Sequence, residues 1–281
     1  MLYPKGKALL NRKYDFFLAG SDQVWTSNHA EVLSNNLLSF VLPYKRYSYA
    51  ASFGSAQLKE CDRTLIQSEI PLFSGLSVRE NEAVNVLSSF YHQPVSVHID
   101  PVFLVNKNDW SRLSYKYSSK KIRHLERSKY LLLYWLGSDQ KRGQEIANEI
   151  AKRDGLEVIY IPLYSSDEST NPFSNVSPFE FVFLIEHATF VVTNSFHGTA
   201  FSIIFNKKFL SVPIKGSLAS SADSRFLNLQ KIFQLPLSCF DSASQDETAV
   251  DWNFVNNAIH QQQAKSDAYF DGMLKNAKHG K

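Results

Sequence analysis

The sequence predicts an α/β protein built as two Rossmann-like domains. Short apolar runs rich in β-branched and aromatic residues alternate along the chain with segments whose apolar residues recur at helical spacing. Several of these runs end in small polar turns, as parallel strands do where a helix follows. The length of 281 residues, 44% of them hydrophobic, is enough for two ordinary domains with packed cores.

A change of composition divides the chain. From Lys107 to Lys129 there are eight Lys or Arg residues against two acidic ones, with many Ser and Tyr. The preferred interpretation is a solvated linker or hinge, and the alternative is a basic rim over an anionic substrate. We therefore predict an N-terminal Rossmann-like domain over residues 1–106, a basic linker over 107–128, a second such domain over 129–248, and a terminal helix over 249–281 that crosses back to the first domain.

Charge and cysteine content give no sign of nucleic acid, membrane or metal. Thirty basic and 27 acidic residues leave a net charge of +3, so the composition favours no polyanionic partner. Cys61 and Cys239 lie far apart without metal-ligand spacing. No signal peptide and no uncharged apolar run of about 18 residues is visible. We expect a cytoplasmic protein with no transmembrane segment, no nucleic-acid partner and no obligatory metal.

The first strand and its turn carry the first candidate residues. Tyr14–Ala19 has the composition of a buried strand, and Gly20, Ser21 and Asp22 follow it at once. Gly20 lets a ligand approach the backbone closely, while Ser21 and Asp22 place a hydroxyl and a carboxylate at the carboxyl end of the strand. The alternative is a purely structural helix cap or Asx-turn.

Further elements complete the N-terminal domain. Arg79 stands at a strand end, where it either clamps a phosphate or carboxylate or pairs with Glu80 or a neighbouring helix. The predicted elements are strands over Tyr47–Ala51, Gly75–Val78 and Val95–Ile99, and helices over Leu58–Phe73 and Asn81–Phe90.

The second domain repeats the alternation after the basic segment. A helix begins at Arg225, and a terminal helix covers Val250–Leu274. The other predicted elements are strands over Tyr130–Leu136, Leu156–Pro162, Thr189–Thr193 and Lys208–Val212, and helices over Gln140–Arg153 and Pro178–His187, the latter capped by Ser177.

The turn after Thr189–Thr193 is the most informative stretch. It places His197 between a buried strand and an apolar helix, where backbone N–H groups and the helix dipole favour an anion. Ser195 and Thr199 can donate hydrogen bonds to a phosphate there, or they serve the turn alone. A single histidine beside an apolar segment is more often a packed core or surface residue, so this pattern alone does not establish a catalyst.

Motifs along the chain resemble the polysaccharide pyruvyl transferases. DFFLAGSDQVW at 15–25 is similar to the strand and GSDxxW turn of that family, and NSFHGTAFSIIFNKKF at 194–209 resembles its most specific signature. The other matching segments, in the family's order, are KRYSYAASFG at 45–54, SVRE at 77–80, IDP at 99–101, and the closing helices SRFLNLQKIFQL and DWNFVNNAIHQQQAKSDAYFDGML.

Two features depart from the family pattern. Members usually open with a strand and a Gly- or Asn-rich loop ahead of the GSDxxW turn, so we expect the first βα unit to be missing here. Some branches carry an arginine two residues before the histidine, where this chain has Ser195. We therefore expect a donor site that is built differently from the family's or is incomplete.

The resemblance implies two Rossmann-like domains that face each other across a cleft in a glycosyltransferase-B-like (GT-B-like) arrangement. It implies transfer of a pyruvyl group from phosphoenolpyruvate to two hydroxyls of a saccharide or lipid-linked saccharide acceptor, giving a cyclic ketal. We assign His197 as the general acid or as a hydrogen-bond donor that faces the phosphate, and Asp22 as the base. The candidate substrate-binding residues are Arg79, Lys215, Arg225, Ser195, Thr199, Gly20 and Ser21.

Two alternatives stay open. The same scaffold supports a glycosyltransferase that uses a nucleotide-sugar, and a non-catalytic member of a polysaccharide assembly complex is equally compatible with it. Phosphoenolpyruvate is expected as a substrate, and no further cofactor is expected. The sequence does not define the acceptor sugar, the linkage or the oligomeric state.

Overall fold

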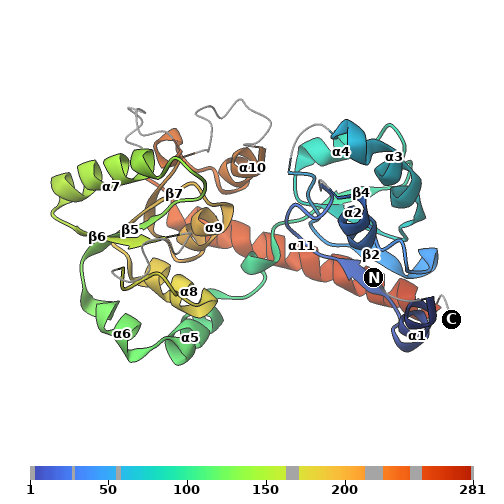
Figure 1. Ribbon diagram of the computed structural model, residues 1–281, viewed down its shortest axis with the longest axis horizontal. Helices are drawn as coiled ribbons and strands as arrows, with labels where there is room; N and C mark the ends of the chain where they lie inside the picture. The colour runs from blue at the N-terminus through green and yellow to red at the C-terminus, as the bar shows by residue number, and fades with distance from the viewer. Residues whose placement is uncertain are drawn as a thin grey trace. The chain divides into compact units, whose positions relative to one another are not determined.

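The computed structural model describes residues 4–26, 29–54, 58–162, 171–212, 224–240 and 249–279. The chain forms two compact units (Figure 1). Unit 1 comprises Met1–Leu104, Ala219–Asn228 and Ala258–Lys281, and unit 2 comprises Val105–Leu218 and Leu229–Asn257. No helix in the described ranges is long and apolar enough to cross a membrane.

The described residues of unit 1 form four short parallel strands. β1 pairs with β2 and β3 pairs with β4, and isolated parallel bridges from Tyr47 to Gly75 and from Ala51 to Val78 connect the two pairs. Their sequence order is therefore also their spatial order. The strands are β1 (Phe17–Ala19), β2 (Arg46–Ser48), β3 (Leu76–Val78) and β4 (Val95–Val97).

Helices cover this sheet and bury an apolar core that includes Trp25, Ile66 and Phe73. The strands are shorter than the predicted runs, because β1 and β3 begin later than predicted and β2 and β4 end earlier. The helices of the N-terminal part are α1 (Pro4–Lys13), α2 (Ala30–Asn36), α3 (Glu60–Glu69) and α4 (Asn81–Leu87), with 3-10 turns η1 (Pro43–Lys45), η2 (Ile70–Leu72) and η3 (Pro101–Phe103).

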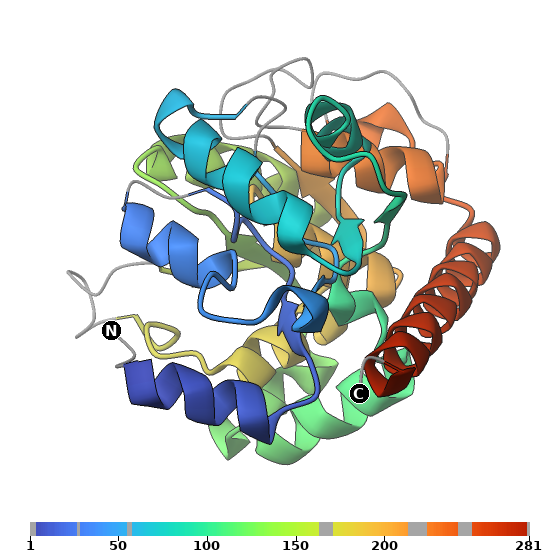
Figure 2. The ribbon, with the colours of Figure 1, turned by 90° about the vertical axis from the view of Figure 1, so that its right-hand side faces the viewer.

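The C-terminal helix α11 (Trp252–His279) is one long uninterrupted helix (Figures 1 and 2). Its residues from Ala258 onward belong to unit 1. There Tyr269 donates a hydrogen bond to the Ser48 carbonyl (2.7 Å), and the ring of Phe270 stacks on Tyr49 at 4.7 Å between centroids. Aromatic packing and buried hydrogen bonds thus hold the helix on the sheet of unit 1.

Unit 2 contains a four-stranded parallel sheet in the order β6-β5-β7-β8. The central strand β5 is buried on both faces, which explains its continuous apolar run. Gly155, with a positive φ of 64°, ends helix α7 before β6. The strands are β5 (Tyr130–Tyr134), β6 (Glu157–Ile161), β7 (Phe190–Thr193) and β8 (Lys208–Ser211).

Helices flank this sheet as the alternation predicts. Helix α8 begins with a capping box in which Ser177 and Glu180 satisfy each other's backbone N–H groups. The helices are α7 (Gln140–Asp154), α8 (Pro178–His187), α9 (Phe196–Ile204) and α10 (Ser224–Phe233), which begins in unit 1, with η7 (Leu237–Cys239).

The structure differs from the linker predicted for residues 107–128. Helices α5 (Lys107–Tyr117) and α6 (Lys120–Arg123) and the 3-10 turn η4 (His124–Arg127) occupy this segment, within unit 2. Asn106 caps α5, and the hydroxyl of Ser114 in α5 donates to Glu186 of α8 (3.1 Å). Serine and tyrosine supply part of the packing face, so the apolar periodicity that marks a helix is weak here.

Candidate active site

The carboxyl ends of the unit 1 strands converge on a buried arginine. Arg79, which follows β3, is 2% exposed, and its guanidinium donates to Glu80 and to Asp100, both at 2.9 Å. Both carboxylates are themselves almost fully buried. Burial lowers the pKa of Arg79, but Glu80 and Asp100 together outweigh it and raise the pKa above its ordinary value.

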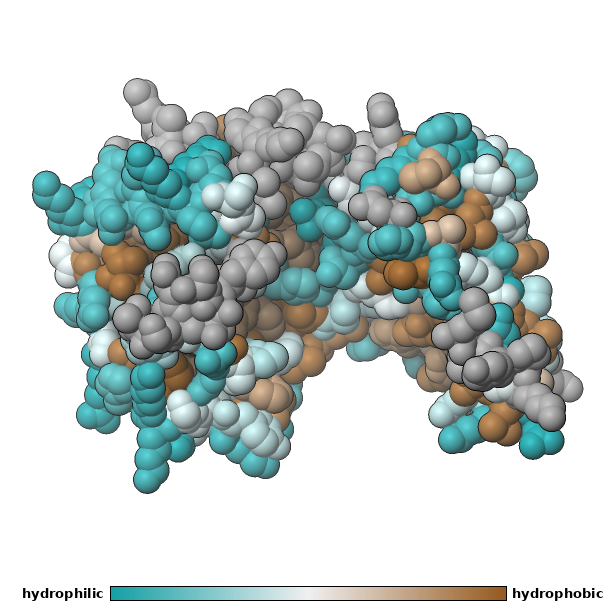
Figure 3. Space-filling view, viewed as in Figure 1, coloured by the Kyte–Doolittle hydropathy of each residue, from teal (hydrophilic) through white to brown (hydrophobic). Residues whose placement is uncertain are grey.

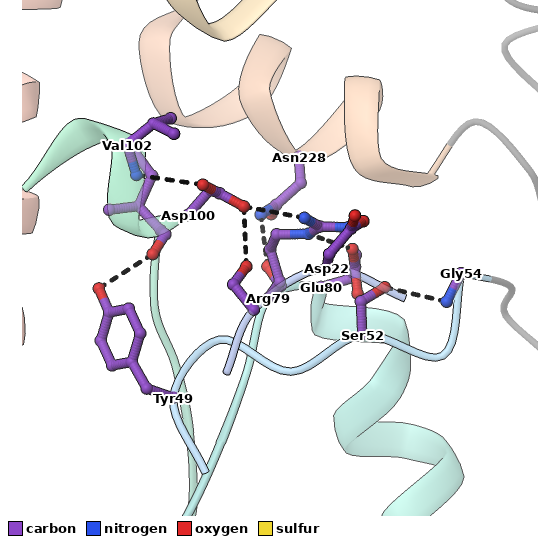
Figure 4. Close-up of polar contacts among 11 residues, drawn as sticks. Asp22, Tyr49, Ser52, Gly54, Arg79, Glu80, Asp100, Val102 and Asn228 are labelled. Carbon is purple, nitrogen blue, oxygen red and sulfur yellow. Dashed lines mark hydrogen bonds and ion pairs between the residues drawn. The ribbon is translucent and has the colours of Figure 1, made fainter. Parts of the chain in front are cut away.

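Asp100 organises the surrounding residues (Figure 4). Besides pairing with Arg79, it accepts hydrogen bonds from the Ser21 hydroxyl (2.7 Å) and from the backbone N–H of Val102 (3.1 Å). Asn228 donates from its side chain to the carbonyl of Arg79 (2.9 Å). Residues that follow β1, β3 and β4, together with α10, therefore form one hydrogen-bonded cluster.

Asp22 is the exposed member of this cluster. Its side chain is 61% exposed, and one carboxylate oxygen lies 3.7 Å from the guanidinium of Arg79. The residue has a positive φ of 75°, and its carbonyl accepts from the N–H of Ser52 (3.0 Å). Gly20 is exposed as well, and a Cβ placed on it would meet no atom within 4 Å. A carboxylate that reaches solvent beside an open backbone can take a proton from a bound hydroxyl.

The sequence left two roles open for Arg79, and the observed ion pairs correspond to the second, pairing with Glu80. An anion-binding role for Arg79 stays a prediction. Arg225, half-buried at the start of α10, has its guanidinium 5.8 Å from the centre of the Phe226 ring, and its predicted role is likewise untested. Lys215 lies outside the described residues.

Unit 2 has its own candidate site, where the order of strands reverses. The chain passes outward from β5 to β6 and then returns to β7 on the other side of β5, and such a reversal in a parallel sheet is where ligands bind. Asn194, which follows β7, accepts from the N–H of Leu136 (2.6 Å) and donates to its carbonyl (2.8 Å). This double hydrogen bond joins the turn after β7 to the loop after β5.

His197 lies in the first turn of α9, directly after this junction. Its imidazole is half-buried, and the Phe196 ring contacts it edge-on at 5.5 Å between centroids. Ser195 caps the helix by accepting from the N–H of Gly198 (3.3 Å). An imidazole at a helix N-terminus beside the carboxyl edge of a sheet is suited to hold an anion and to donate a proton to it.

Gly198 brings this turn close to the sheet. A Cβ at this position would lie 2.6 Å from the hydroxyl oxygen of Thr193, so a side chain cannot be added without movement. Thr199, fully buried, donates to the Ser195 carbonyl (3.0 Å), and its oxygen lies 2.7 Å from that of Ser211 on β8. The hydroxyls of Ser195 and Thr199 therefore have structural partners, which corresponds to the second of the two roles considered for them.

Sequence reasoning did not single out Asp100, Asn228 or Asn194 as site residues. Asn194 directly follows β7 and Asp100 lies three residues after β4, so the carboxyl-end rule that selected Ser21, Asp22 and His197 applies to them equally. Asn228 gives no such signal, because it reaches Arg79 from the middle of a helix. In the part of the chain that the structure describes, no group of three or more His, Cys, Asp or Glu residues is placed to hold a metal ion.

Two units with parallel strands and polar clusters at their carboxyl edges define an α/β protein of the Rossmann-like class. The polysaccharide pyruvyl transferase family model matches residues 2–216, and the chain belongs to that family. None of the curated proteins compared with it matches.

Solved structures of UDP-GlcNAc 2-epimerases resemble the chain in fold. One from Methanocaldococcus jannaschii is 13% identical, with a TM-score of 0.52 over 92% of this chain and 72% of that one. Another, from Rickettsia bellii, is 12% identical with a TM-score of 0.48 over 95% and 77%. The Methanocaldococcus jannaschii neighbour is GT-B-like, and with the parallel strands it confirms the predicted α/β class. The missing first βα unit stays a prediction.

Proposed function

We propose that this protein transfers a pyruvyl group from phosphoenolpyruvate to two hydroxyls of a cell-surface polysaccharide or its precursor. The family match over residues 2–216 carries the proposal, since it supports a transferase with a pyruvyl transfer role in polysaccharide biosynthesis. A saccharide acceptor is consistent with that family. Phosphoenolpyruvate as donor and the ketal as product are the finer parts of the proposal.

The reaction defines what the site has to supply. Protonation of the methylene carbon of the enol makes a methyl group and leaves a cationic centre at the adjacent carbon. One acceptor hydroxyl adds there, phosphate leaves, and the second hydroxyl closes the ketal. Of the two protons lost by the hydroxyls, one balances the proton given to carbon and the other leaves with phosphate. The chemistry therefore needs an acid, a base and a site for the anionic groups.

The described residues can fill these roles. His197, at the helix N-terminus beside the β5–β7 junction, is assigned as the general acid or as a hydrogen-bond donor to the phosphate. Asp22, the solvent-exposed carboxylate of the unit 1 cluster, is assigned as the base for an acceptor hydroxyl. Asp100 and Glu80 already neutralise the guanidinium of Arg79, so in this proposal Arg79 stabilises the turn that presents Asp22.

Calorimetric titration with phosphoenolpyruvate tests the donor site. We expect binding by the wild type and at least a 10-fold weaker affinity for His197→Ala, because a hydrogen bond to a charged group is lost. His124→Ala is the matched control, since His124 is a histidine of the same unit on η4, away from α9 in the sequence. Equal affinity of wild type and His197→Ala would remove His197 from the donor site.

The same titration separates the alternatives. A nucleotide-sugar-dependent glycosyltransferase would bind UDP or a UDP-sugar and not phosphoenolpyruvate. UDP is the nucleotide to use as probe, because the Methanocaldococcus jannaschii protein of similar fold is a UDP-GlcNAc 2-epimerase. A non-catalytic assembly subunit would bind a saccharide and release no phosphate from phosphoenolpyruvate. Either result would replace the proposed reaction.

A further inference from the structure

A strongly basic surface lies on unit 2. It is formed by α5, α6, η4 and the two residues that follow, Ser128 and Lys129, and we call it the basic face. Its only acidic members are Asp109 and Glu126, against eight basic residues, while the rest of the chain has 22 basic and 25 acidic residues. The basic members are Lys107, Arg112, Lys116, Lys120, Lys121, Arg123, Arg127 and Lys129.

The helices hold these charges outward. Ser114, Ile122 and Leu125 point inward and are buried, and the hydroxyl of Ser114 is bound to Glu186 of α8. Most of the eight basic residues are exposed, whereas Arg123 is half-buried. Figure 3 shows hydrophilic side chains projecting at the lower left, where Figure 1 places α5 and α6. The charges are thus presented by a folded surface and not by a solvated linker.

Exposed tyrosines lie among the charges. Tyr115 and Tyr117 of α5 are 48% and 52% exposed. The guanidinium of Arg123 lies 5.1 Å from the centre of the Tyr115 ring, and the ammonium of Lys116 lies 5.0 Å from that of Tyr117. The contact between Tyr115 of α5 and Arg123 of α6 makes the face continuous across both helices.

Helix α7, the next helix along the chain, shows that this excess of basic residues is local. It has four basic and three acidic residues, and Lys141 pairs with Glu145 while Arg153 pairs with Asp154. In the basic face, Arg112 forms an ion pair with Asp109. Glu186 and Glu180 of α8 also bind this segment, at the hydroxyl of Ser114 and the N–H of Ser119. Four carboxylates cannot neutralise eight cations, so the face keeps a net positive charge.

We propose that the basic face docks unit 2 on an anionic phospholipid surface. Clusters of four to eight Lys and Arg residues on a helical surface attract acidic lipid headgroups, at about 1 kcal/mol for each residue near the surface. Five of the eight are Lys, whose compact charge needs no fixed partner geometry, and the amphipathic tyrosine rings suit the headgroup region. The inference does not depend on the proposed transfer reaction.

Co-sedimentation with vesicles tests this docking. The full chain is mixed with vesicles of phosphatidylcholine alone or with one third phosphatidylserine, at low and at high salt. The test variant is Lys107→Glu with Lys116→Glu and Lys120→Glu. The control is Lys141→Glu with Lys152→Glu and Lys231→Glu, three exposed lysines elsewhere in unit 2, which changes the net charge by the same amount.

We expect binding to the phosphatidylserine vesicles alone, weakening as salt rises. Partitioning falls by about 100-fold or more in the test variant, because three attractive charges are lost and three repulsive ones added, and by a few-fold at most in the control. Circular dichroism verifies that both variants are folded. Equal losses in the two variants, or no wild-type binding, would overturn the proposal. Tighter binding to a random RNA oligonucleotide than to vesicles would assign the face to nucleic acid instead.

Discussion

The carboxyl edges of the two sheets, one in each unit, differ in the kind of polar interaction that stabilises them. In unit 1 the edge is built from buried charges, with Arg79 held between Glu80 and Asp100. In unit 2 it is built from neutral hydrogen bonds through Thr193, Asn194 and Thr199, with His197 as the half-buried titratable group. All buried charged residues among those described belong to unit 1.

This difference has consequences for substitution. Removing one partner of a buried ion pair leaves the other charge without compensation in a poorly polarisable environment, at a cost of about 3–5 kcal/mol. Removing one partner of a neutral hydrogen bond costs about 1–3 kcal/mol. Single substitutions at the carboxyl edge of unit 1 should therefore lower the free energy of unfolding more than those at the carboxyl edge of unit 2.

The largest expected effect is that of Asp100→Ala. It removes a carboxylate from Arg79 and an acceptor from Ser21, so we expect unfolding free energy to fall by about 3–5 kcal/mol in urea titrations. Replacing the whole buried charge cluster, Arg79→Met with Glu80→Leu and Asp100→Leu, should recover much of the loss, because no buried charge is then left without a partner. Asp109→Ala, which breaks an exposed ion pair, is the control and should change stability little. Equal effects of Asp100→Ala and Asp109→Ala would refute the comparison.

The second prediction concerns the pH dependence of stability, which a buried histidine of unit 1, His98, should dominate in the acidic range. His98 follows β4, is 3% exposed, and contacts the hydroxyl of Ser266 (3.3 Å) and the rings of Tyr49 and Tyr269. Burial, and then the positive charge of Lys265, lower the pKa of His98 to about 4. At pH values between the ordinary pKa of 6.5 and this lowered pKa, His98 binds a proton in the unfolded chain but stays neutral in the folded chain.

Stability should therefore fall as the pH decreases from about 6.5 towards 4, by up to about 3 kcal/mol from this residue. His98→Gln keeps a hydrogen-bonding side chain and does not titrate, so its stability should depend less on pH in this window. His92→Gln, at an exposed histidine of the same unit, should keep the wild-type dependence. Urea titrations at a series of pH values measure both, and identical profiles for wild type and His98→Gln would contradict the assignment.

The third prediction compares one glycine from each edge. Gly198→Ala places a Cβ 2.6 Å from the hydroxyl of Thr193, and we expect a loss of about 1–3 kcal/mol from overpacking. Gly20→Ala meets no atom within 4 Å and should change stability by about 0.5 kcal/mol or less. Thermal unfolding of the two variants measures the difference. A loss of stability in Gly20→Ala larger than that in Gly198→Ala would contradict this prediction. It would mean that the backbone conformation at Gly20, and not the open space around it, determines the effect of the substitution.

The sequence predicted the alternation and the residues that end strands, because both depend on neighbours in the chain. Buried runs such as Leu131–Leu133 and the polar turn at Asn194 are local signals. The pairing of Arg79 with Asp100 joins residues that follow two different strands, and that of Asn194 with Leu136 spans 58 positions, so neither leaves a local pattern.

The prediction of a linker over residues 107–128 was wrong for a related reason. Helix α5 packs on α8 partly through the hydroxyls of Ser111 and Ser114, which are bound to Glu186, and a pattern search for apolar periodicity does not register such contacts. Charge and serine content alone therefore resemble a linker. What distinguishes this segment is the pair of caps, Asn106 and Ser119, each accepting a hydrogen bond from a backbone N–H three residues later.

The smallest expected effect tests Thr199, which is both a candidate ligand residue and a structural one. Its single proton goes to the Ser195 carbonyl, which can only accept, so the hydroxyl of Ser211 must donate to Thr199. Thr199→Val should therefore cost about 1 kcal/mol of stability, whereas Thr199→Ser keeps both bonds and costs less. Because the hydroxyl is already engaged, phosphoenolpyruvate affinity should change far less than in His197→Ala. A loss of affinity in Thr199→Val equal to that of His197→Ala, with unfolding unchanged, would instead place Thr199 on the substrate.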